Sequence, residues 1–319
     1  CYLPLLAFLT FDDEAEQYVC AAILRPGNVG ATRGARGLLR RLLDMLRIAF
    51  PKARFLVRLD GGFASPEILD FLDAGRGVDY VVAMAENAVL TRLAEPAMVE
   101  ARARSEASGQ TEHVYTEARY AAKTWPHTRR VVIKAEVVRL AGREPRDNAR
   151  CVITNRRQSP RFLYEEIYCA RGDIENRIKE LKRDLSADRL SCHSYRANAF
   201  RLKLHALAYQ LLVLFRLHAL RTTDLAHAQR ERPRQQHFRH VEGDAQALAQ
   251  AQPEDVEIAP QELYLVAQRG LRLARALQGG AQPGDEVGEQ ALGAHRIAAD
   301  QDGKVGQRVE QEVRLDLRL

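Results

Sequence analysis

Hydrophobic and polar positions along the first 85 residues predict an α/β segment. Two apolar runs, 2–10 and 18–24, flank a short polar turn, which is typical of an antiparallel hairpin. Leucines recur at helical spacing over 37–48, with arginines on the opposite face. The segment then predicts, in order, a strand at 55–59, a helix capped by Ser65 and running to 72, and a strand at 78–84. This order favours a layered α/β fold.

The pattern changes between residues 86 and 158. A helical stretch at 88–103 leads through a polar loop to three apolar runs, at 114–120, 130–139 and 151–154. Helices return at 160–184 and 196–220. We therefore divide the chain into a first core part (1–85), a mostly β insertion (86–158), C-terminal core helices (159–221) and an atypical tail (222–319).

The tail differs from the rest in composition. Fourteen of its 98 residues are Gln, against four in the preceding 221, and its apolar positions keep no sustained period. Two interpretations stay open. One is a disordered segment. The other is translation of GC-rich DNA in a shifted frame, which the abruptness of the change favours.

Charge is unevenly distributed. The tail carries 12 Lys/Arg and 16 Asp/Glu, and the whole chain carries 48 and 42, which leaves 36 basic and 26 acidic residues before it. A basic segment of this kind suits a phosphate backbone as partner. Five scattered cysteines predict neither a disulfide framework nor a zinc site, and no apolar run could span a membrane. We expect no signal peptide and a cytoplasmic protein. Because residue 1 is Cys, we also expect the natural start to lie upstream.

One stretch carries a chemical pattern. On a continuous α-helix, Tyr168, Arg171, Glu175 and Lys182 would fall within a sector of about 60°. An ordinary amphipathic surface helix explains this as well, with Arg171 and Glu175 as an i, i+4 pair. The chemistry favours a phosphate site, because an arginine and a lysine can hold phosphate while the carboxylate serves as a Mg²⁺ ligand.

The spacing Y-x2-R-x3-E-x6-K resembles the signature of the bacterial insertion-sequence DDE transposases called the YREK group. The resemblance covers residues 2–220 and is greatest to the group 1 transposase DDE domains. It includes Leu24-Arg25-Pro26-Gly27-Asn28, the strand that ends at Asp60, the stretch 168–182 and the Ser191-Cys192 segment.

The resemblance implies a ribonuclease H-like mixed sheet with flanking helices and a β-rich insertion. It implies that Asp60 and Glu175 are catalytic carboxylates that hold two Mg²⁺ or Mn²⁺ ions, which would support DNA strand cleavage and strand transfer. Tyr168, Arg171 and Lys182 would hold phosphates of the element end. The partners implied are double-stranded DNA, both element ends and target, and a second copy of the chain in a homodimer.

Two further features follow from the resemblance. Trp125 would stack on a base flipped out of the DNA end, although a tryptophan in the core explains the residue equally well. The first catalytic Asp would lie on a first strand that precedes the hairpin, and we expect that strand to be missing here. Asp12 and Asp13 are candidates for that Asp, but the pattern places them in a hairpin turn.

With its first strand missing, the sheet would expose an edge, and the chain as written would be inactive. Loss of the amino-terminal DNA-binding region is expected as well. The alternatives are a non-catalytic DNA-binding remnant, a ribonuclease H-like nuclease that does not need the Tyr/Arg/Lys set, and a plain structural helical protein.

Overall fold

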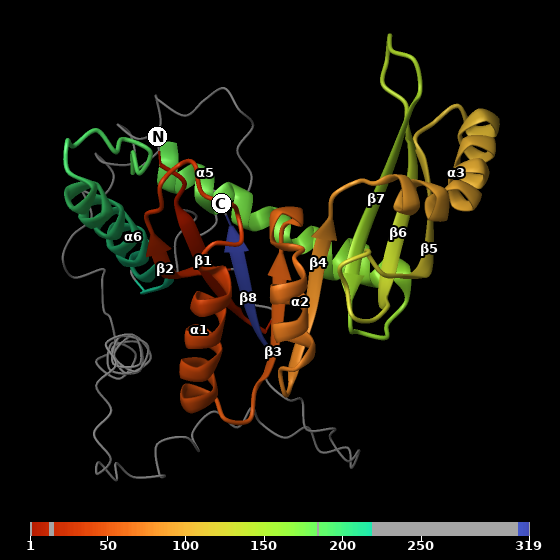
Figure 1. The fold of residues 1–319 in the computed structure, drawn as a ribbon. Coiled ribbons are helices and arrows are strands. Elements are labelled where there is room, and N and C mark those ends of the chain that lie inside the picture. Colours follow the sequence, from red (N-terminus) through yellow and green to blue (C-terminus); the bar gives the residue numbers. More distant parts are fainter. Residues whose placement is uncertain (1, 13–15, 184, 219–311, 319) are drawn as a thin grey trace, which may run out of the picture.

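The computed structural model describes residues 2–12, 16–183, 185–218 and 312–318 (Figure 1). Asp13 and most of the atypical tail therefore lie outside the described residues. Eight strands form one mixed sheet in the order β2-β1-β8-β3-β4-β7-β6-β5. The sheet and its flanking helices agree with the expected ribonuclease H-like fold.

The first part of the chain folds as its hydrophobic pattern predicts. Strands β1 (Leu5–Phe11) and β2 (Tyr18–Ile23) form an antiparallel hairpin. Helix α1 (Ala35–Ala49) buries its leucine stripe, and the Ser65 hydroxyl caps α2 (Pro66–Asp73). The parallel strands β3 (Arg54–Leu59) and β4 (Val78–Met84) flank α2 in sequence. The predicted elements of this part are confirmed, with boundaries that differ by a few residues.

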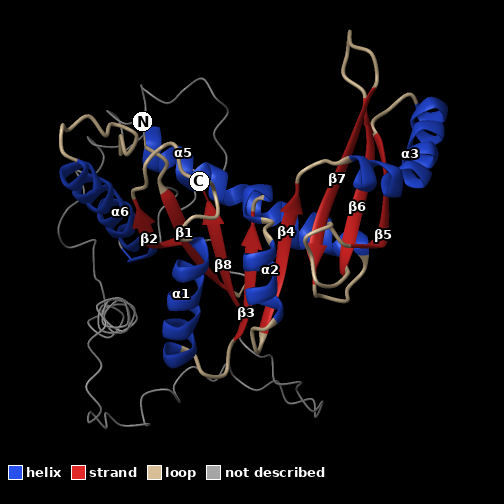
Figure 2. Cartoon of the chain, viewed as in Figure 1, coloured by secondary structure: helices blue, strands red, loops and turns tan. Residues whose placement is uncertain are grey.

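The insertion consists of helix α3 (Ala88–Ser108) and strands β5 (Glu112–Tyr120), β6 (Arg129–Val138) and β7 (Arg146–Thr154). Each of the three strands is antiparallel to the next, and β7 is also antiparallel to β4. The insertion therefore extends the same sheet sideways, as Figure 2 shows.

Strand β8 (Glu312–Arg318) corrects two expectations. It lies between β1 and β3, antiparallel to the first and parallel to the second, so the expected open edge does not exist here. It also belongs to the atypical tail, for which the sequence predicts either a disordered segment or translation in a shifted frame. Val313, Leu315 and Leu317 alternate with charged residues and are fully buried. Residues from the far end of the sequence thus supply a central strand.

Helices cover both faces of the sheet (Figure 1). α1 and α2 pack on the face that receives the apolar side chains of β8. The other face is covered by α5 (Gly172–Arg183) and α6 (Tyr195–His218), whose buried residues cluster with Leu6 and Phe8 of β1. None of the described helices is long and apolar enough to cross a membrane.

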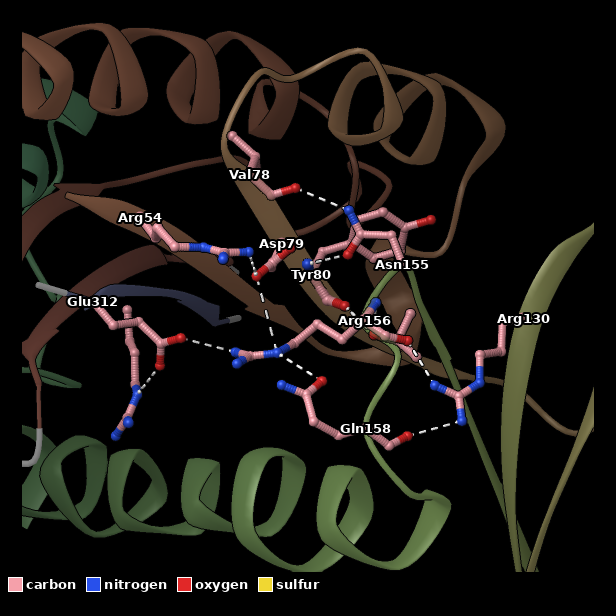
Figure 3. A network of polar contacts seen from close by, with 11 residues as sticks. Arg54, Val78, Asp79, Tyr80, Arg130, Asn155, Arg156, Gln158 and Glu312 are labelled. Carbon is pink, nitrogen blue, oxygen red and sulfur yellow. Dashed lines mark hydrogen bonds and ion pairs between the residues drawn. The ribbon is translucent and has the colours of Figure 1, made fainter. Parts of the chain in front are cut away.

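A polar network holds the beginning of β8 (Figure 3). The Glu312 carboxylate accepts hydrogen bonds from Arg156 at 2.9 Å and from Arg314 at 3.0 Å. Burial alone would raise the pKa of Glu312, but these arginines outweigh it and the pKa is lowered. Asn155 links the same loop to β4. Its side-chain oxygen accepts a hydrogen bond from Tyr80 N and its side-chain nitrogen donates one to Val78 O, each at 2.9 Å. The strand is therefore anchored by the chain that leaves β7.

Candidate active site

Asp60 lies directly after β3, where the chain turns away from the sheet. Leu59 before it is fully buried, and Phe63 anchors the 3₁₀ turn Gly61–Phe63 that follows it. The Asp60 side chain is 26% exposed and accepts a hydrogen bond from Arg318 Nη1 at 2.6 Å. The backbone thus fixes a carboxylate at the end of a central strand.

Glu175 reaches the same place from a helix. Ile174 and Leu181 of α5 are buried and dock the helix on the sheet. Glu175, next to Ile174, is 54% exposed, and its Oε1 lies 3.3 Å from Arg318 Nη2. Packing of α5 therefore brings the second predicted carboxylate to the guanidinium that also contacts Asp60.

A second ion pair lies deeper on the same face. Arg58 of β3 and Asp316 of β8 are neighbours in the parallel ladder, and both side chains are buried. Arg58 Nε and Nη2 donate to the two Asp316 oxygens at 2.8 and 2.7 Å, and Nη1 donates to the Ile167 carbonyl at 3.3 Å. This bidentate pair joins β3, β8 and the helical segment before α5.

The helix expected to carry the Tyr/Arg/Glu/Lys pattern is not a continuous α-helix. A π-helical segment, Leu163–Tyr168, and a 3₁₀ turn, Cys169–Arg171, precede α5. Tyr168 and Arg171 therefore belong to irregular turns, while Glu175 and Lys182 lie on the regular helix. The continuous α-helix from which the 60° sector was predicted is therefore absent over residues 163–171, because those turns do not advance by 100° per residue.

Residues 1–239 match the family described as transposase DDE domain group 1. The chain belongs to this transposase family. The match extends beyond residue 221, where the resemblance was expected to end, but it does not include β8. A search of the curated proteins finds no match.

Membership of the transposase family supports a transposase role. DDE transposases depend on metal, so the carboxylate pair must be tested as a metal site. The structure brings together Asp60 and Glu175, and it places the Arg318 guanidinium against both. The nearby carboxylate of Asp316, on β8, already forms an ion pair with Arg58. A permanent cation already sits at the pair, so these residues do not fit a divalent metal ion in this arrangement.

A different group in this transposase chain could hold a metal ion. Asp70, Asp73 and His127 place ligand atoms within 4.8 Å of one another. Arg129 forms ion pairs with both carboxylates, and Tyr80 donates to Asp73 at 2.6 Å. Burial would raise the pKa of Asp73, but hydrogen bonds from Tyr80, His127 and Arg129 lower it. Arg129 supplies the compensating charge, so these residues form an ion-paired cluster between α2 and the start of β6.

Trp125 lies in the interior of the insertion. It is 9% exposed, meets the Tyr120 ring edge-on at 5.3 Å and lies 4.9 Å below the Arg129 guanidinium. This packing corresponds to the alternative of a tryptophan in the core. Base stacking by Trp125 stays a prediction, and it would require the ring to leave these contacts.

Asp12 is the remaining sequence candidate among the described residues. Asp12 bonds the backbone of Glu312, at the opposite end of β8 from Arg318, so it is remote from Asp60. Sequence reasoning missed Arg58, Asp316 and Arg318. Two signals could have revealed them: a charged residue inside the apolar run of β3, and the alternation of apolar and charged residues over β8.

Proposed function

We propose that this chain is a transposase subunit that binds the ends of a DNA element, with Asp60 and Glu175 as its catalytic carboxylates. The convergence of these two residues carries the proposal. They lie far apart in the sequence, and the end of β3 and the docked α5 bring them to one guanidinium. The family match supports the same assignment. The role places the protein with DNA in the cytoplasm, and pairing of two element ends calls for a homodimer.

DNA would lie along the exposed side of α5. Lys179, Lys182 and Arg183 are exposed there, and the last two lie in the final turn of the helix. Arg171 precedes the helix, and Tyr168 is partly exposed beside it. Cations near Glu175 can hold backbone phosphates and so set the position of the DNA against the carboxylates. We propose Arg171, Lys182 and Tyr168 as the phosphate-holding residues.

Salt-dependent binding to duplex DNA tests this proposal. Fluorescence anisotropy should show an affinity that falls steeply with salt, and Lys182→Ala should lower the magnitude of the log–log slope by about 1. Lys52→Ala is the matched control, because Lys52 is exposed in the turn at the other end of β3. Equal effects of the two substitutions would contradict the proposed DNA surface.

We further propose that the chain as it stands does not cleave DNA, because among the described residues only Asp60 and Glu175 converge on the site as expected, and the nearby Asp316 is paired with Arg58. A nicking assay with Mn²⁺ on a supercoiled plasmid should show no activity for the natural sequence. Nicking that disappears in Glu175→Gln would refute this inactivity. If nicking survives in both Arg171→Ala and Lys182→Ala, a nuclease of the same fold becomes the better assignment.

A further inference from the structure

Arg318 occupies its position because the backbone holds it there. The residues of β8 pair with β1 on one side and β3 on the other, and three of its side chains are buried in the main core. Arg318 is the last residue of this strand, and its side chain is 8% exposed. Its guanidinium therefore reaches the carboxylates from inside the sheet, whereas a surface side chain would reach them from solvent.

The guanidinium makes contacts of the kind a bound cation would make. Nη1 meets Asp60 and Nη2 meets Glu175, at 2.6 and 3.3 Å, and among the described residues the buried Nε has no hydrogen-bond partner. An arginine side chain carries a permanent positive charge. Two carboxylates that would otherwise repel each other thus share one positive charge.

We propose that Arg318 is a built-in cation that blocks divalent metal binding at the Asp60–Glu175 pair. The inference rests on the proposed role of these two carboxylates. A metal ion at the pair would have to displace the guanidinium or lie beside it, and two positive charges a few ångströms apart repel each other. The blocking residue comes from outside the part of the chain that matches the family. The block is therefore a property of this chain and its β8.

Substitution of Arg318 should open the pair to metal. We would titrate Mn²⁺ into the full chain and measure the free ion by electron paramagnetic resonance. The natural sequence should bind no Mn²⁺ through Asp60 and Glu175. Arg318→Ala should bind it weakly, and Arg318→Asp should bind it at least tenfold more tightly than Arg318→Ala, since it adds a third carboxylate beside Asp60.

Control variants show whether Asp60 and Glu175 bind the additional Mn²⁺. In the Arg318→Asp background, Asp60→Asn and Glu175→Gln should each abolish the gained Mn²⁺ binding. Arg314→Ala removes the same charge from the same face of β8, but Arg314 pairs with Glu312 at the start of the strand. Arg314→Ala should therefore bind no more Mn²⁺ than the natural sequence does. Circular dichroism and thermal unfolding would establish that each variant is folded.

Two results would overturn the block. One is Mn²⁺ binding to the natural sequence that is lost in Asp60→Asn, which would still support the proposed catalytic role of Asp60. The other is a folded Arg318→Asp that gains no Mn²⁺ binding. If Arg318→Asp does not fold, hydrogen exchange of the β8 amides in the natural sequence decides. If Mn²⁺ lowers the exchange protection of the β8 amides in the natural sequence but not in Asp60→Asn, the metal displaces Arg318. That result would contradict the block. The DNA-binding surface is judged separately by the Lys182→Ala measurement.

Discussion

The strands of the insertion form antiparallel pairs with one another, whereas the centre of the sheet combines antiparallel and parallel pairs, and the chain reaches the two regions by different routes. Strands β5, β6 and β7 follow one another and pair in sequence order. Strand β8 pairs with β1 and β3, which lie near the other end of the sequence. Local pairing needs only short turns, whereas β8 must close a very long loop before its contacts form. The centre of the sheet is therefore the part whose stability depends on a distant segment.

The largest expected effect comes from the buried ion pair at the centre. Asp316→Ala leaves Arg58 buried and uncompensated, which should lower the free energy of unfolding by about 3–5 kcal/mol. The matched change in the insertion is Asp147→Ala, whose partner Arg102 is 42% exposed. That change should cost at most about 1 kcal/mol. Urea denaturation of both variants measures the difference, and similar losses would show that the Arg58–Asp316 pair does not support β8.

The double substitution Arg58→Met with Asp316→Leu sharpens this result. It replaces the pair by apolar groups of similar size and should recover most of the loss in Asp316→Ala. A double variant as unstable as Asp316→Ala would mean that the loss has another origin than the unpaired arginine.

A cavity made in β8 and a similar cavity made in β6 should destabilise different regions of the sheet. Leu315 in β8 and Ile133 in β6 are both fully buried. Each change to Ala should cost about 2–5 kcal/mol. Hydrogen exchange should separate them: Leu315→Ala should speed exchange in β1 and β3, and Ile133→Ala in β5 and β7. If Leu315→Ala leaves β1 and β3 protected, β8 is not what joins them.

The smallest effect is a pH dependence shared by the two regions. Glu312 at the start of β8 and Glu136 in β6 both have a pKa below the ordinary 4.5. For Glu136, burial would raise the pKa, but Lys134 and Asn148 outweigh it through hydrogen bonds. A lowered folded-state pKa gives stability that is complete above pH 4.5 and is lost as pH falls through the folded value.

Unfolding free energies measured from pH 6 down to pH 3 test this dependence. Glu312→Gln and Glu136→Gln should each make the acid loss of stability shallower, because each removes one carboxylate that must otherwise be protonated. An unchanged slope in Glu312→Gln would indicate that the network of Figure 3 does not hold the start of β8.

The sequence by itself determined the local elements of the first part of the chain. Ser65 and Pro66 start α2, the leucine stripe defines α1, and apolar runs mark the strands, because these signals act over a few residues. Local patterns also mark the stretch around Glu175 and the strand before Asp60, but the catalytic role of the two carboxylates follows from the family resemblance and stays a prediction. The structure brings both side chains to Arg318.

Only the tertiary structure decided what fills the centre of the sheet. The seven residues of β8 alternate clearly, but nothing local in them indicates which strands they join. Their place follows from two open strand edges and a buried Arg58 that requires a carboxylate partner. The same placement puts Arg318 between Asp60 and Glu175, so the state of the candidate site is decided by long-range pairing.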